Sequence, residues 1–132
     1  MAEGDADRLR SAYEAFNEGG VDAILERLDP EIHVQERETL PDRATYRGRE
    51  GVRQMFQVIL EAFDDFHFEV EDVVDREKHV VVVLRQVVHG RRSGIRLSGD
   101  TVHVWRMRDG RPVALTVFGS RAQALAALDD VG

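Results

Sequence analysis

Lys78–Phe118, with the sequence KHVVVVLRQVVHGRRSGIRLSGDTVHVWRMRDGRPVALTVF, is the stretch that decides the fold of this chain. It consists of three segments rich in valine and other β-branched residues, which pack well on a pleated surface. A Gly-Arg-Arg-Ser-Gly loop separates the first two segments, and the turn Arg108–Gly110 separates the last two. Asp109-Gly110 is a pair that tolerates the left-handed backbone of a tight hairpin. We therefore predict consecutive antiparallel strands, with an apolar face that the earlier part of the chain must cover.

Composition limits the classes of function. The 132 residues suffice for one domain, residues 1–132, with a single sizeable core. The chain has 25 acidic and 18 basic side chains, which gives a net charge of −7 and disfavours nucleic acid as a partner. Cysteine is absent, which excludes disulfides and thiolate chemistry. The N-terminal residues show neither a secretion signal nor a long apolar run, so we expect a cytoplasmic protein that binds no membrane.

Helical periodicity predicts three helices before the sheet. Apolar residues recur at the spacing i, i+3, i+4, i+7 in residues 5–17, again in residues 21–28, and again from Val52 to Phe63. The third helix has the most regular apolar stripe, formed by Val52, Met55, Phe56, Ile59, Leu60 and Phe63. A short last helix is predicted after Ser120, because Ser120 and Gln123 form a capping-box pattern.

Two further strands are predicted outside the long stretch. Residues 32–37 alternate weakly, and residues 66–75 alternate apolar with charged side chains. Residues 38–48 have no periodicity and are predicted to form a loop. The resulting order, α-α-β-α-β-β-β-β-α, favours an α+β fold with a mostly antiparallel sheet. We expect a pocket where the straight third helix crosses the strongly curved sheet.

Three segments of the chain resemble the SnoaL-like branch of the NTF2-like superfamily. They are YEAFNEGGVDAILERLDPEIHV (13–34), YRGREGVRQMFQVILEAFDDFHFEVEDV (46–73) and HVWRMRDGRPVALTVF (103–118). The resemblance covers nearly the whole chain and implies a cone of three helices wrapped by a curved sheet, with an apolar cavity at its mouth. It further implies a homodimer paired through the outer face of the sheet. Apolar residues such as Val81, Val83 and Val87 on that second face favour such a dimer.

Two sets of catalytic residues known in the superfamily are incomplete here. The ketosteroid isomerase positions fall near Ala12 or Tyr13, near Gln35 or Glu36, and near Val102. For the limonene-epoxide-hydrolase set only Arg85 matches, because the two aspartate positions fall at valine and threonine. Polyketide cyclases of the family use an aspartate and a histidine within the cavity, and the resemblance places Asp100 and His103 on the corresponding strand.

The candidate catalytic residues are therefore His103, Asp100 and Tyr13. His103 shares a strand face with Thr101, Trp105 and Met107, and its imidazole could transfer protons if that face is the inner one. If the strand is shifted by one residue, His103 lies outside. Tyr13 could stabilise an oxyanion or be an ordinary core aromatic. The candidate substrate-binding residues are Phe16, Gln35, Met55, Phe56, Arg85, Trp105 and Phe118.

Arg85 has two interpretations, because it lies among valines. It could anchor an acidic ligand or pair internally with Glu36 or Glu69, or it could face solvent.

The histidines show no metal-ligand spacing, and neither a phosphate-binding loop nor a nucleophile elbow is present, so no cofactor is implied.

The sequence therefore predicts a protein that binds a small apolar organic molecule. The sequence leaves open whether the protein also catalyses a cofactor-free acid–base reaction, as an isomerase or cyclase of a polyketide-like substrate would. The alternative is a non-catalytic binding or dimerisation module with a residual cavity.

Overall fold

The computed structural model describes residues 4–36, 45–76, 79–90 and 94–128. Its helices are α1 (Asp5–Gly19), α2 (Val21–Leu25), α3 (Gly48–Ala62) and α4 (Arg121–Ala126). Its strands are β1 (His33–Glu36), β2 (Thr45–Arg47), β3 (Phe63–Arg76), β4 (His79–Gly90), β5 (Arg96–Arg108) and β6 (Arg111–Phe118). In the described residues, no helix is long and apolar enough to cross a membrane.

The strands form one sheet in the order β2-β1-β6-β5-β4-β3. All neighbours pair antiparallel except β1 and β6, which are parallel. The predicted α+β fold with a mostly antiparallel sheet is confirmed. The predicted loop after β1 is wrong at its end, because Thr45–Arg47 forms the short strand β2; its part up to residue 44 lies outside the described residues. Three residues are too few for alternation to reveal a strand.

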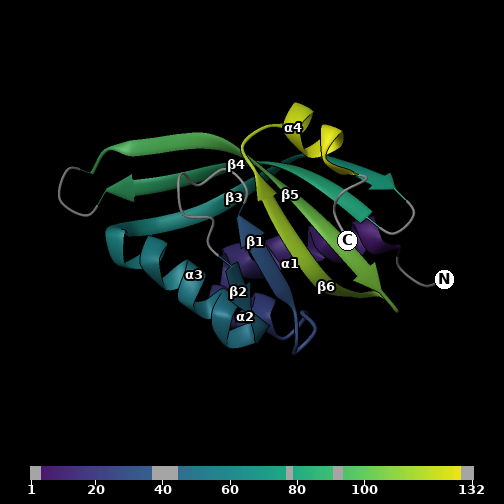
Figure 1. Cartoon of the computed structure of the whole chain (residues 1–132). Helices are drawn as coiled ribbons and strands as arrows, with labels where there is room; N and C mark the ends of the chain where they lie inside the picture. The colour runs from purple at the N-terminus through teal and green to yellow at the C-terminus, as the bar shows by residue number, and fades with distance from the viewer. Residues whose placement is uncertain (1–3, 37–44, 77–78, 91–93, 129–132) are drawn as a thin grey trace.

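The sheet has helices on both faces (Figure 1). α1, α2 and α3 lie on one side, which we call the inner face, and α4 lies on the other, the outer face. The inner face carries the main core. The outer face carries a smaller apolar cluster of Val81, Val102, Val104, Phe118 and Ala124. Ser120 caps α4 by accepting a hydrogen bond from the Gln123 amide, as the sequence pattern predicts.

α1 and α3 bury the apolar stripes that the sequence predicts, with one exception. The buried residues of α1 are Leu9, Ala12, Tyr13 and Phe16. In α3, Val52 and Phe56 are buried, and Met55 and Leu60 are half-buried against the core. Phe63 was predicted to close the helical stripe, but it is the first residue of β3. The side chain of Ile59 lies outside the described residues.

The hairpin between β5 and β6 also ties the sheet to α1. Asp109 and Gly110 both have positive φ, at 53° and 77°, as the predicted tight turn requires. The guanidinium Nη1 of Arg8 donates to the carbonyl oxygen of Gly110 over 3.0 Å. This contact fixes the N-terminal part of α1 at one end of β5, and the following turns of α1 then cross the inner face.

Candidate functional site

Strand β5 presents its central residues alternately to the two faces of the sheet. His103 pairs with Val82 and Val117, and Trp105 pairs with Val80 and Leu115. Both side chains are directed to the inner face and are almost fully buried, with 6% and 3% of their surface exposed. The structure therefore places this strand in the first of the two orientations that the sequence leaves open.

A chain of hydrogen bonds connects Trp105, Tyr13 and His103. The indole Nε1 of Trp105 donates to the hydroxyl oxygen of Tyr13 over 2.8 Å. The same hydroxyl lies 2.6 Å from Nδ1 of His103. The indole nitrogen can only donate, so Nδ1 is the one of these two neighbours that can accept the buried Tyr13 proton, and we assign the imidazole tautomer in which it does so. Nε2 of His103 consequently carries the imidazole hydrogen, and no partner for Nε2 is found among the described residues.

Burial keeps both titratable members of this chain neutral. It lowers the pKa of His103 from 6.5 to about 3, because the charged imidazolium would lose its hydration. Burial also raises the pKa of Tyr13 far above its usual value, and the hydrogen bond from Trp105 opposes this only in part. At neutral pH the site therefore contains a neutral imidazole with a fixed tautomer, which can donate a hydrogen bond from Nε2.

Aromatic rings enclose the imidazole. The ring of Phe68 meets His103 edge-on at a centroid distance of 5.4 Å, and meets Tyr13 at 5.4 Å as well. Asn17 of α1 holds this part of β3 in place: its Nδ2 donates to the Phe68 carbonyl over 2.8 Å, and its Oδ1 accepts from the Phe68 amide over 2.9 Å. The helix thus positions both Tyr13 and the strand that carries Phe68.

Two hollows meet at His103. The first has a volume of only about 10 Å³ and is lined by Tyr13, Phe56, Trp105 and their apolar neighbours, so it holds one water at most. The second has a volume of about 150 Å³ and opens between α3 and the inner face. We call it the His103 pocket; its lining residues are Met55, Phe56, Phe66, Phe68, Gln86, Thr101, His103 and Val117. Tyr13 and Trp105 are therefore behind His103 and do not line the larger space.

Of the remaining predicted site residues, some line the His103 pocket and others lie elsewhere in the fold. Met55 and Phe56 line the His103 pocket as expected, whereas Phe16 packs behind it against Phe56, at a centroid distance of 4.9 Å. Phe118 lies in the outer cluster covered by α4. It pairs with Val102, the neighbour of His103, so its side chain is on the opposite face of the sheet.

Asp100 and Arg85 also lie outside the pocket, so the candidate catalytic residue Asp100 does not share the pocket with His103. Asp100 precedes His103 by three positions, and in a continuous strand an odd offset places the two side chains on opposite faces. Asp100 is exposed and pairs in register with exposed Arg85, which in turn pairs with Glu69. This row of opposite charges is solvated on the outer face. Glu36, the other partner considered for Arg85, has a side chain outside the described residues.

Sequence analysis missed several pocket residues, of which Gln86 and Thr101 are the polar ones. Thr101 precedes His103 by two residues, so alternation alone would have placed it beside the imidazole once His103 was placed inside. Gln86 could not be found in this way, because it reaches the pocket through the pairing of β4 with β5.

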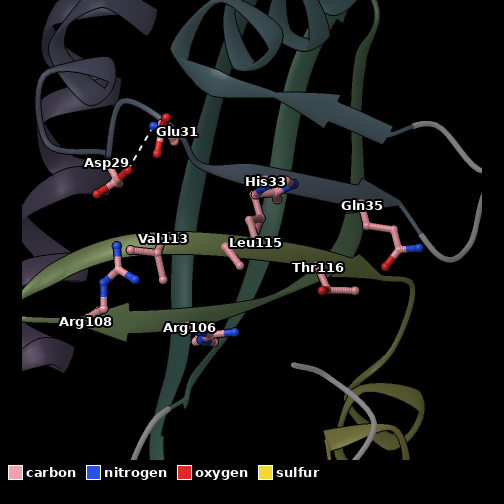
Figure 2. A pocket seen from close by; sticks show the side chains of 10 residues that line it. Asp29, Glu31, His33, Gln35, Arg106, Arg108, Val113, Leu115 and Thr116 are labelled. Atoms are coloured by element: carbon pink, nitrogen blue, oxygen red, sulfur yellow. Dashed lines mark hydrogen bonds between the residues drawn. The ribbon is translucent and has the colours of Figure 1, made fainter.

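A larger hollow lies on the outer face and is a different kind of site (Figure 2). This outer groove has a volume of about 450 Å³ and is formed over β1, β6 and β5. The predicted residue Gln35 lines one end of this groove, and charged side chains of both signs line the rest, including Asp29, Glu31, Arg106 and Arg108. Within the described part of the chain, no group of three histidine or carboxylate side chains could hold a metal ion.

Comparison with known proteins identifies the family. Residues 9–115 match the model of the SnoaL-like domain. An NTF2-like protein of Burkholderia thailandensis E264 is 24% identical, with a TM-score of 0.76 over 96% of this chain and 98% of that one. IdmH of Streptomyces antibioticus, a proposed polyketide cyclase, is 22% identical, with a TM-score of 0.75 over 96% and 99% of the two chains.

TerC, crystallised with polyporic acid, is 17% identical, with a TM-score of 0.75 over 95% of this chain and 98% of that one. No curated protein matches the sequence. These structural similarities show the same fold, and the matched family model covers most of the chain. The chain therefore belongs to the family of SnoaL-like domains.

Proposed function

We propose that the chain binds a small, mostly apolar organic molecule in the His103 pocket, and that His103 donates a hydrogen bond to an acceptor oxygen such as a carbonyl. Aromatic and aliphatic side chains make up most of the pocket wall, while Gln86, Thr101 and His103 supply its polar groups. Such a wall, with a few convergent polar groups, is typical of small-molecule sites. TerC, which shares this fold, was crystallised with the small molecule polyporic acid.

The observation that carries this proposal is the chain of hydrogen bonds from Trp105 through Tyr13 to His103. It commits Nδ1 as an acceptor and leaves Nε2–H as the donor. A neutral imidazole held in this way binds an oxygen that carries negative partial charge without transferring a proton in the ground state. The His103 pocket is therefore specific for ligands with an acceptor over pure hydrocarbons.

Turnover by an isomerase or cyclase mechanism is the second candidate. Polarisation of a carbonyl by His103 would make a neighbouring C–H more acidic, and this is the chemistry that an isomerase or cyclase needs. A base is also required, and no carboxylate or lysine is among the described residues that line the pocket. Binding alone, by a non-catalytic module, needs no such group and accounts for all the described lining residues.

A pair of ligands with matched shape tests the proposal. Acetophenone and ethylbenzene differ chiefly in the carbonyl oxygen, so the ratio of their dissociation constants isolates the hydrogen bond. We expect acetophenone to bind about tenfold more tightly, which corresponds to about 1.4 kcal/mol. His103→Phe should remove the preference, and Asp100→Ala, on the outer face, should retain it. Equal affinities of the two ligands for the unmodified chain would contradict the proposal.

We also propose that the chain forms a homodimer through the outer groove. The dimer contact expected through Val81 and Val87 is not available, because both side chains are fully buried within the chain. Val81 belongs to the apolar cluster that α4 covers. The outer groove instead presents exposed Glu31 and Arg108. In a two-fold interface, each glutamate could face the arginine of the partner.

A further inference from the structure

A second apolar hollow lies next to the His103 pocket on the inner face. It has a volume of about 260 Å³ and is lined by Phe63, Phe66, Gln86, Val88, Leu97, Ser98 and Gly99. Phe66 and Gln86 also line the His103 pocket, so the two hollows share a wall. The second hollow, which we call the tail groove, lies where the end of β4 and the start of β5 extend past the C-terminal end of α3 (Figure 1).

The floor of the tail groove is apolar and uncovered. Leu97 leaves 52% of its surface exposed, although it lies opposite Val88 in the sheet. Gly99 lies opposite Gln86, and a Cβ added at Gly99 would meet no atom within 4 Å. Gly99 precedes Thr101 by two positions and His103 by four, and because both offsets are even, that Cβ would project from the same inner face. A leucine and a glycine beside an open space form a floor on which an apolar chain can lie.

We propose that the tail groove binds the apolar tail of an elongated ligand whose acceptor oxygen is held by His103. This inference rests on the proposed function and specifies its ligand class: a carbonyl compound with a long, unbranched apolar extension on one side. Phe66 and Gln86 line both hollows, so a tail that leaves the His103 pocket along these two side chains would enter the tail groove. Burial of the tail would also cover the exposed surface of Leu97, which the chain itself leaves open to water.

A series of alkyl phenyl ketones tests the length preference. Acetophenone, butyrophenone and octanophenone share the carbonyl and the ring, and differ only in the length of the alkyl chain. Each buried methylene contributes about 0.8 kcal/mol, so affinity should rise about threefold to fourfold per added carbon until the groove is filled. Affinities are measured by isothermal titration calorimetry or by ligand-observed NMR.

Gly99→Leu is the decisive variant, because it fills the tail groove without reaching His103. Gly99 has no positive φ, so a side chain there causes no backbone strain. We expect Gly99→Leu to lower the affinity for octanophenone at least tenfold and to change that for acetophenone less than twofold. Asp100→Leu adds the same side chain one residue along, on the outer face, and should change neither. Leu97→Asp, at an exposed position, should also weaken octanophenone selectively.

The outcomes separate this inference from the proposed function. If acetophenone binds but longer ketones bind no better, or Gly99→Leu and Leu97→Asp both leave octanophenone binding intact, the tail groove is not a ligand site and the proposed function stands. If no ketone of the series binds, the proposed function fails and this inference fails with it. Selective loss of octanophenone in both variants supports the inference.

Discussion

The hydroxyl of Tyr13 lies 2.6 Å from Nδ1 of His103, across 90 residues of sequence. This contact joins the first helix to a strand in the interior of the sheet, and in the assigned tautomer it leaves the imidazole hydrogen on Nε2. Tyr13 therefore acts through His103: its own hydroxyl is shared between Trp105 and His103, so it is not available to a ligand.

Replacement of Tyr13 by phenylalanine should destabilise the chain. Tyr13→Phe leaves the buried indole N–H of Trp105 without its acceptor and Nδ1 of His103 without its donor. An unsatisfied buried polar group costs about 1–3 kcal/mol, so the loss in the free energy of unfolding should lie in or above that range. Urea denaturation followed by circular dichroism measures it. A loss below about 0.5 kcal/mol would mean that the hydrogen-bond chain is not formed in solution.

Acid should destabilise the fold through His103. Burial lowers the pKa of His103 to about 3, against 6.5 for a free histidine. Between these values the unfolded chain binds one proton more than the folded chain, so stability decreases as the pH falls from about 6.5 towards 3. The slope is about 1.4 kcal/mol per pH unit for one such group.

This pH dependence can be assigned to His103 by comparing denaturation at pH 7 and pH 5 in the parent chain and in His103→Gln. The variant has no titrating ring at this position, so its stability should change less over the same interval. Equal changes in the two proteins would show that His103 titrates normally in the folded state.

Alternation along one strand predicted that His103 and Trp105 share a face of the sheet, but it left open whether that face is the inner one. The same rule argued against Asp100 in the pocket, since its separation from His103 is odd. The resemblance had offered both residues as catalytic candidates, and the register of the strand decides which of them faces inward.

Other features depend on tertiary structure that alternation does not contain. The burial of Phe118 and Val81 on the outer face results from the placement of α4, and the link between Tyr13 and His103 results from the crossing of α1 over the sheet. Gln86 enters the pocket only through the register between β4 and β5. These contacts join segments that are far apart in the sequence, so local patterns could not reveal them.

Asn17 should be essential for the position of Phe68. Its side chain makes two hydrogen bonds to the backbone of Phe68, and Asn17→Ala removes both. We expect a loss of about 1–3 kcal/mol in the free energy of unfolding and weaker binding of acetophenone, because Phe68 lines the pocket. Glu18→Ala, at the next and exposed position of α1, is the matched control and should be neutral in both assays.

The proposed dimer can be tested by mass. Multi-angle light scattering at micromolar concentration should give twice the monomer mass of 15.0 kDa. Arg108→Glu should shift the mass towards the monomer, because it places like charges opposite Glu31 in the proposed interface. A monomer mass for the unmodified chain would exclude a stable dimer.

The most direct test of the account is the protonation state of the His103 side chain, measured by long-range ¹H–¹⁵N NMR between pH 5 and pH 8. We predict a neutral ring throughout, with the hydrogen on Nε2 and none on Nδ1. We further predict that acetophenone shifts the Nε2 resonance saturably and that ethylbenzene does not. A ring that titrates near 6.5, a hydrogen on Nδ1, or an Nε2 signal that does not respond to the ketone would contradict the account.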